Sequence, residues 1–197
     1  TEHSHQPQHQ EHSPATLTSA PVDPHIWLSP ANARKIVQQI ARALIQYDPQ
    51  HAEQYRENAA QLQERIEQLD LELMRLLEPV RDQPFLVYHD AYQHFERHYS
   101  LNSLGPVTLS AERKPGARQV RQVAALLQQH PGICVFSEPQ FNARLITNLA
   151  HNHQANVQEL DPLGVSLNPG PDAWFELMQN IARNMQRCLS HEQLTAQ

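Results

Sequence analysis

Two hydrophobic patterns divide the chain near Pro84. Between residues 30 and 78, apolar residues recur every three or four positions, which is the spacing of one face of an α-helix. Beyond Pro84, short apolar runs bounded by turn residues alternate with further helical stretches. The first part therefore predicts two consecutive helices, and the second predicts strands that alternate with helices.

The two predicted helices each begin with a capping residue followed by proline. Ser29 precedes Pro30 and Asp48 precedes Pro49, and proline fits the first helical position because its missing N–H is not needed there. The first helix would carry one apolar face, formed by Ile36, Val37, Ile40, Ala41, Leu44 and Tyr47. The second would span residues 49–78 and measure about 45 Å. That length suits either a coiled-coil seam or a strut packed along two lobes.

Beyond residue 84 the pattern predicts four strands and four further helices. The strands are expected at 85–89, 104–109, 133–137 and 157–161. The helices are expected at 90–98, 115–129, 141–153 and 172–189. Strands that alternate with helices are typical of βαβ units. The predicted fold class is therefore α/β, with a mostly parallel four-stranded sheet, helices on both faces and the long helix before it.

Composition adds a candidate chemistry. The chain of 197 residues has a formal net charge of −6, which does not favour a nucleic-acid surface. Its apolar runs are all shorter than the roughly 18 residues of a membrane span, so we expect no spanning segment. The 13 histidines, against 2 cysteines, indicate a metal instead.

Several of these histidines lie in residues 1–20, which lack apolar periodicity and are expected to form a mobile polar segment. They are irregularly spaced among Gln, Ser and Pro, at His3, His5, His9 and His12. Neutral imidazoles in such a segment can gather a borderline metal loosely, without a rigid geometry. We therefore expect auxiliary metal gathering in this segment.

Other candidates lie at the carboxyl ends of the predicted strands, where ligands bind in open parallel sheets. His89 ends the first strand, Glu138 follows the third and Asp161 ends the fourth. His25 lies in the loop "DPHIWLSP" before a helix, where a stiff backbone can pre-orient its ring. These positions are the main candidates for a functional site, with His25, His89 and Asp161 as its candidate metal ligands.

His94 and His98 stand at i and i+4 on the helix after His89, a spacing that holds zinc in zincins. The acid between them, Glu96, is at the third position rather than the second, so it points away from their shared face. We expect both histidines on the wetter surface of the helix, without zincin-type catalysis.

The two cysteines allow two interpretations. Cys134 lies in the apolar run "GICVFS" and Cys188 lies near the end of the last predicted helix. Two isolated buried thiols and one disulfide are both compatible with these positions. A bridge between them would stabilise the fold by about 4 kcal/mol in the chain-entropy treatment, and would indicate an oxidising compartment.

Five segments together carry a family resemblance. In chain order they are "DPHIWLSP", "YHDAYQHF", "ERKPGARQV", "VFSEPQF" and "LDPLG". They resemble the periplasmic zinc-binding proteins of bacterial high-affinity zinc ABC transporters, in the cluster A-I family of metal receptors. The resemblance covers roughly residues 21–190. It implies the helical-backbone receptor fold, in which one long helix joins two α/β lobes and metal binds between them.

The resemblance also implies roles for individual residues. His25 and His89 match two metal-binding histidines of the family, and Asp161 matches the acid that completes the site in some members. Cys134 and Cys188 match a disulfide found in part of the family. The implied division is a His-rich loop at 1–20, a remnant of an N-terminal lobe at 21–48, the linker helix at 49–79 and a C-terminal α/β lobe at 80–197.

The implied function is capture of Zn²⁺ in the periplasm and its delivery to the membrane permease of an ABC transporter, without catalysis. The full-length receptor would be a monomer. In the family, another histidine ligand precedes the His-rich loop, and this chain begins inside that loop. We therefore expect either a fragment or a truncated receptor.

Two alternatives stay open. One is a structural or interaction module in which the long helix forms a dimer seam. The other is a zinc-dependent hydrolase with Glu138 as its base. If the chain binds metal as expected, His89→Ala should lose high-affinity zinc and His94→Ala should keep it.

Overall fold

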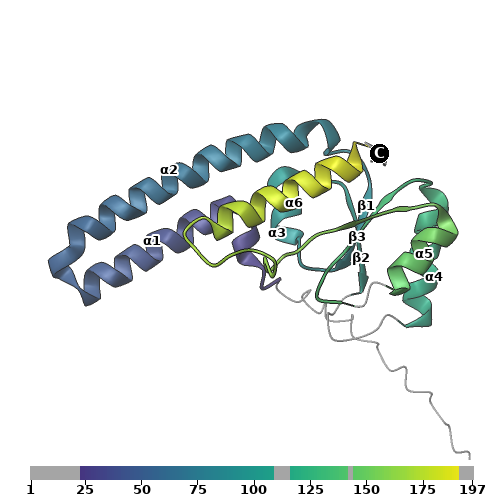
Figure 1. The fold of residues 1–197 in the computed structure, drawn as a ribbon, viewed down its shortest axis with the longest axis horizontal. Helices are drawn as coiled ribbons and strands as arrows, with labels where there is room; N and C mark the ends of the chain where they lie inside the picture. Colours follow the sequence, from purple (N-terminus) through teal and green to yellow (C-terminus); the bar gives the residue numbers. More distant parts are fainter. Residues whose placement is uncertain (1–22, 109–115, 142–143, 191–197) are drawn as a thin grey trace, which may run out of the picture.

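The computed structural model describes residues 23–108, 116–141 and 144–190. In Figure 1, two long helices lie side by side and extend away from a compact body of strands and shorter helices. The His-rich segment predicted at residues 1–20 lies outside the described residues.

The two long helices form where the capping pattern predicts them. Helix α1 covers Pro30–Tyr47, and the Ser29 hydroxyl accepts a hydrogen bond from the main-chain N–H of Asn32 at 3.4 Å. Helix α2 covers Ala52–Leu77 and follows a short 3₁₀ turn, η2, at Pro49–His51. The expected helix at 49–78 is thus one α-helix with a 3₁₀ turn at its start.

The body contains a parallel sheet of four strands. The strands are β1 (Phe85–His89), β2 (Ser103–Thr108), β3 (Cys134–Ser137) and β4 (Asn156–Glu159). Their order is β2-β1-β3-β4, and every neighbouring pair is parallel. The remaining helical elements are η1 (Ile26–Leu28), η3 (Glu78–Val80), α3 (Gln93–Tyr99), α4 (Ala117–Gln129), α5 (Arg144–His153) and α6 (Ala173–Leu189). The predicted α/β class with a parallel four-stranded sheet is confirmed.

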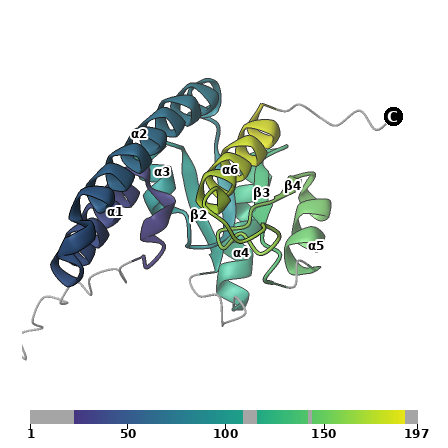
Figure 2. The same cartoon turned by 60° about the vertical axis from the view of Figure 1, so that its left-hand side comes forward.

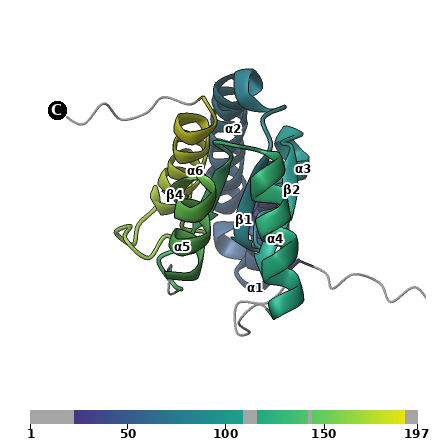
Figure 3. The ribbon, with the colours of Figure 1, turned by 90° about the vertical axis from the view of Figure 1, so that its right-hand side faces the viewer.

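Helices cover both faces of the sheet because alternate strand residues point to opposite sides. On one side, Leu86 and Val135 pack with Val123 of α4 and Ile146 of α5. On the other, a larger cluster joins the sheet to α2, α3 and α6. Figure 2 shows α2 and α3 on one side of the strands and α5 on the other. Figure 3 shows α4 and α5 in front of the sheet with α2 behind it.

The two ends of α2 have different surroundings. Near its C-terminus, Ile66, Leu69, Leu73 and Leu77 are buried in the same cluster as residues of α6. This part of the apolar seam is therefore occupied within the chain and is not free for a coiled-coil partner. Near its N-terminus, α2 packs on α1, and Ile40 of α1 remains 54% exposed.

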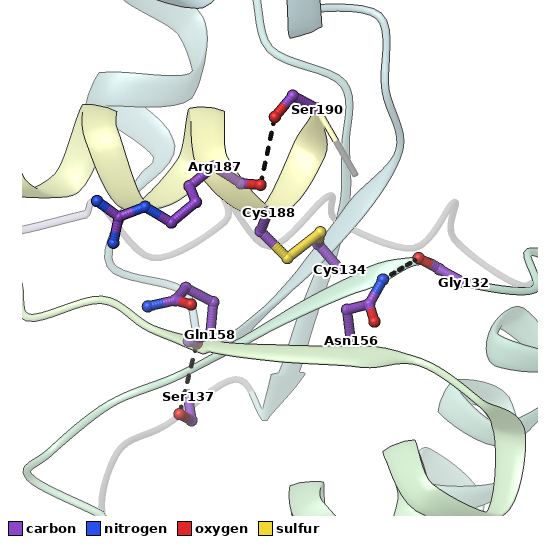
Figure 4. Close-up of a disulfide and its surroundings, with 8 residues drawn as sticks. All are labelled: Gly132, Cys134, Ser137, Asn156, Gln158, Arg187, Cys188 and Ser190. Atoms are coloured by element: carbon purple, nitrogen blue, oxygen red, sulfur yellow. Dashed lines mark hydrogen bonds between the residues drawn. A yellow bond between two sulfur atoms is a disulfide. The ribbon is translucent and has the colours of Figure 1, made fainter. Parts of the chain in front are cut away.

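A disulfide joins α6 to the sheet. Cys134 at the start of β3 and Cys188 near the end of α6 are bonded, with their Cα atoms 6.1 Å apart. Figure 4 shows the bridge above β3, close to the hydrogen bond that the Asn156 side chain donates to the Gly132 carbonyl at 3.0 Å. Of the two interpretations that the sequence allowed, the disulfide is the one observed.

Several predicted boundaries need correction. Strand β4 ends at Glu159, two residues before Asp161. Helix α3 begins at Gln93 rather than at residue 90, because the chain first turns, with the Ala91 N–H donating to the His89 carbonyl at 2.9 Å. Among the described helices, none is long and apolar enough to cross a membrane.

Candidate metal centre

Two histidines from distant parts of the sequence meet at the carboxyl edge of the sheet. His89 is the last residue of β1, and His25 lies immediately before η1. Their ring centroids are 5.4 Å apart, with the rings at 70° to each other. The structure thus brings together the two histidines that the sequence selected by separate arguments.

A buried carboxylate holds one nitrogen of each ring. The Nδ1 atom of His25 lies 2.7 Å from Oδ1 of Asp23, and Nδ1 of His89 lies 2.6 Å from Oε1 of Glu138. An ionised carboxylate can only accept a hydrogen bond, so each Nδ1 carries the proton. In a neutral ring protonated at Nδ1 the lone pair is on Nε2, which is the arrangement that carboxylates impose on metal-binding histidines.

The same carboxylate oxygens also hold the backbone of the two histidines. The main-chain N–H of His25 donates to Oδ1 of Asp23 at 3.0 Å, and that of His89 donates to Oε1 of Glu138 at 3.4 Å. The side chains of Asp23 and Glu138 are each only 1% exposed. Each histidine is therefore oriented at both its main chain and its ring.

Sequence reasoning missed these two carboxylates as partners. For Glu138 a signal was present, because it follows β3, and β3 pairs directly with β1. For Asp23 the signal was its position two residues before His25, within reach of an Asx turn. Glu138 was considered as a hydrolytic base, but its Oε1 atom is already occupied by the His89 ring.

Aromatic rings border the histidine pair. The ring centroid of Trp27 lies 5.2 Å from that of His25, and the centroid of Phe141 lies 5.3 Å from that of His89. In the segment that follows His89, burial raises the pKa of Tyr92 well above its usual value and raises the pKa of Glu96 to about 7.

Asp161 organises the loop that follows β4. Its Oδ1 atom accepts hydrogen bonds from the main-chain N–H groups of Leu163 and Gly164 and from the side chain of Gln140, at 3.1, 3.0 and 2.6 Å. Its Oδ2 atom accepts from the main-chain N–H of Val165 at 2.6 Å. Gly164 has a φ of +68°, which suits glycine in this tight turn. The expected metal ligand therefore stabilises a loop in this structure.

Replacing Asp161 with alanine is expected to lower the free energy of unfolding by about 2 kcal/mol, because several N–H donors lose a charged acceptor. Urea denaturation measures the change. Asp82→Ala is the matched control, since that side chain is 91% exposed. Equal stability of the two variants would show that the Asp161 hydrogen bonds do not hold the loop.

The surface placement expected for His94 and His98 is wrong. The side chains are only 21% and 19% exposed. Nε2 of His94 lies 3.0 Å from the carbonyl oxygen of Asp23, and Nε2 of His98 lies 2.8 Å from Oδ1 of Asp70 on α2. Helix pattern alone could not show these contacts, because η1 and α2 pack against the side of α3 that was expected to face water.

The described residues contain no group of three or more His, Cys, Asp or Glu side chains arranged to hold one metal ion. In the described part of the chain, the candidate donors that come together at this edge are the two rings of His25 and His89. His3, His5, His9 and His12 are outside those ranges.

A parallel α/β sheet with two carboxylate-oriented histidines at its carboxyl edge is typical of an α/β metal-binding protein. Comparison with known proteins gives the particular family. The sequence model of the family described as "ZnuA: Zinc-uptake complex component A periplasmic" matches residues 1–188. This chain belongs to the ZnuA family.

Individual relatives agree with this assignment. The high-affinity zinc uptake system protein ZnuA of Brucella suis is 40% identical over 168 residues, which are 85% of this chain and 50% of that protein. The protein of the same name from Yersinia pestis is 32% identical over 165 residues, covering 84% of this chain and 52% of its own length. The chain thus spans about half the length of the curated relatives it matches.

Solved structures show the same fold. A crystal structure of ZnuA superposes with a TM-score of 0.74 at 27% identity, covering 92% of this chain and 66% of that one. A deletion mutant of ZnuA with zinc bound gives a TM-score of 0.71 at 29% identity, covering 84% of this chain and 60% of that one. The described α/β body is therefore a ZnuA-type fold.

Proposed function

We propose that this chain carries the His25 and His89 part of a periplasmic zinc receptor, which captures Zn²⁺ and delivers it to the membrane permease of an ABC transporter. The observation that carries the proposal is the pair of rings whose Nδ1 atoms are held by Asp23 and Glu138. The relatives are high-affinity zinc uptake proteins, which supports the same cargo.

The donor chemistry favours zinc over harder cations. Neutral imidazole nitrogen suits Zn²⁺, whereas Mg²⁺ and Mn²⁺ prefer oxygen ligands. Because both rings are already oriented, binding does not have to order them first. The geometry therefore favours tight capture of a nitrogen-binding metal.

Asp161 is the proposed oxygen ligand. To reach the metal, one of its carboxylate oxygens has to give up or share a hydrogen bond to the 163–165 loop. Metal binding would then be coupled to rearrangement of this loop.

The other segments have roles in the same proposal. The His-rich segment at 1–20 gathers zinc, and the helix at 49–79 joins two lobes. Residues 21–48 belong to the first lobe and residues 80–197 form the second.

A receptor requires no catalysis, and the proposal includes none. Glu138, the base that a zinc hydrolase would need, has a side chain that is 1% exposed and is engaged by His89. The Oε1 atom in that position orients the His89 ring.

Calorimetric titration with zinc and with magnesium tests the proposal. The chain is used with His3, His5, His9 and His12 replaced by alanine, so that loose binding to this segment does not contribute. We expect one saturable zinc site per chain and no comparable magnesium binding. Loss of all zinc binding in this variant would place the metal in the N-terminal segment and contradict the proposal.

A further inference from the structure

His94 links the helix that follows His89 to the segment that carries His25. It lies in the first turn of α3, the helix that follows His89, and its Nε2 atom is 3.0 Å from the carbonyl oxygen of Asp23. A carbonyl oxygen only accepts hydrogen bonds, so Nε2 of His94 must carry the proton and donate it. The contact joins residues that are 71 positions apart in the sequence.

Asp23 is the residue that orients His25. Its Oδ1 atom accepts from both the main-chain N–H and the ring Nδ1 of His25, at 3.0 and 2.7 Å. Its Oδ2 atom is buried, has no hydrogen-bond partner among the residues that the structure describes, and lies 4.0 Å from Nε2 of His94. The His94 N–H therefore donates from α3 to the carbonyl of Asp23 and lies near its carboxylate.

We propose that His94 is a positioning residue for metal capture: it fixes Asp23 so that the carboxylate of Asp23 holds His25 toward His89. The inference rests on the proposed function, in which His25 and His89 bind the metal. It replaces the expectation that loss of His94 has no effect on zinc affinity.

Other hydrogen bonds hold the same loop at a different place. The Trp27 indole donates to the Pro162 carbonyl at 3.1 Å, and the Trp174 indole donates to the Trp27 carbonyl at 2.9 Å. Both act on η1, after His25 in the chain. The His94 contact acts before His25, on Asp23 itself. Without it, η1 would stay in place while Asp23 lost its link to α3.

His98 provides a matched comparison on the same helix. It is one turn after His94, has a similar exposed fraction and is also bonded to an acidic residue, but that residue is Asp70 of α2. Loss of His98 would weaken the packing of α3 on α2 without removing a contact to Asp23. A general loosening of α3 and a specific effect on His25 can therefore be separated.

The test compares three variants of the chain. His94→Phe keeps a ring but removes the donor, His94→Gln keeps an N–H that can reach the carbonyl, and His98→Phe is the control. We expect a zinc dissociation constant about tenfold higher for His94→Phe, as is typical when a residue that orients a ligand is lost. His94→Gln and His98→Phe should remain close to the parent chain.

A second readout uses the metal-free protein. Long-range ¹H–¹⁵N NMR reports which nitrogen of His25 carries the proton. We expect a single form of His25, protonated at Nδ1, in the parent, in His94→Gln and in His98→Phe. In His94→Phe we expect a mixture of the forms protonated at Nδ1 and at Nε2. An unchanged His25 spectrum in His94→Phe, or a mixture in His94→Gln, would overturn the proposal.

The same experiment separates this inference from the function on which it rests. If His89→Ala binds zinc as tightly as the parent chain, the proposed ligands are wrong. The protonation of His25 in the metal-free variants is measured without zinc, so it tests the role of His94 by itself.

Discussion

Replacing His89 with alanine is expected to weaken zinc binding by a factor on the order of 100 or more, because the site loses one of its two oriented nitrogen donors. This loss of zinc affinity should be larger than the loss caused by replacing a residue that only orients a ligand. Titration against a competing chelator measures it. His89 is also the ring partner of Glu138, so the melting temperature is recorded with each titration.

His151→Ala is the control for this loss. His151 lies in the last turn of α5 and is exposed, so its removal changes the histidine count without touching the site. Equal zinc affinities for the His89 and His151 variants would show that the metal binds elsewhere on the chain.

Removing the disulfide is expected to lower the free energy of unfolding by about 4 kcal/mol. The bridge between Cys134 and Cys188 spans 54 residues, which is a long loop to close in the unfolded chain. The double replacement Cys134→Ala and Cys188→Ala removes it without leaving a thiol. Urea denaturation of this variant and of the parent, each with and without reductant, measures the difference.

The parent should become as unstable as the double variant when it is reduced, whereas reductant should not change the variant. A parent that keeps its stability after full reduction would show that the bridge does not stabilise the fold. The effect also bears on the site, because α6 carries Trp174, whose indole holds η1 through the Trp27 carbonyl. Loosening α6 is therefore expected to increase the mobility of the loop that contains His25.

The sequence predicted most of the fold because its signals are local. The Ser29–Pro30 cap placed the start of α1, and short apolar runs placed all four strands to within a few residues. The rule that ligands bind at the carboxyl ends of parallel strands selected His89. The family resemblance selected His25 and His89 together.

The parts that were missed depend on contacts between distant segments. Glu138 and His89 are 49 positions apart, and His94 and Asp23 are 71 apart. Each pair forms only when β3 packs beside β1 or when η1 packs on α3, and no local pattern encodes that packing. For Asp161 the sequence predicted a place near the end of the last strand, two residues from where β4 ends, but not the hydrogen bonds that hold its carboxylate.

The central claim is that Nε2 of His25 and Nε2 of His89 bind the same zinc ion. The most direct test is an anomalous-difference map from crystals grown with zinc and measured at the zinc absorption edge. We expect one strong peak about 2.0–2.1 Å from both Nε2 atoms, with each Nδ1 still bonded to Asp23 or Glu138. A zinc peak that lies away from either of these rings would contradict it.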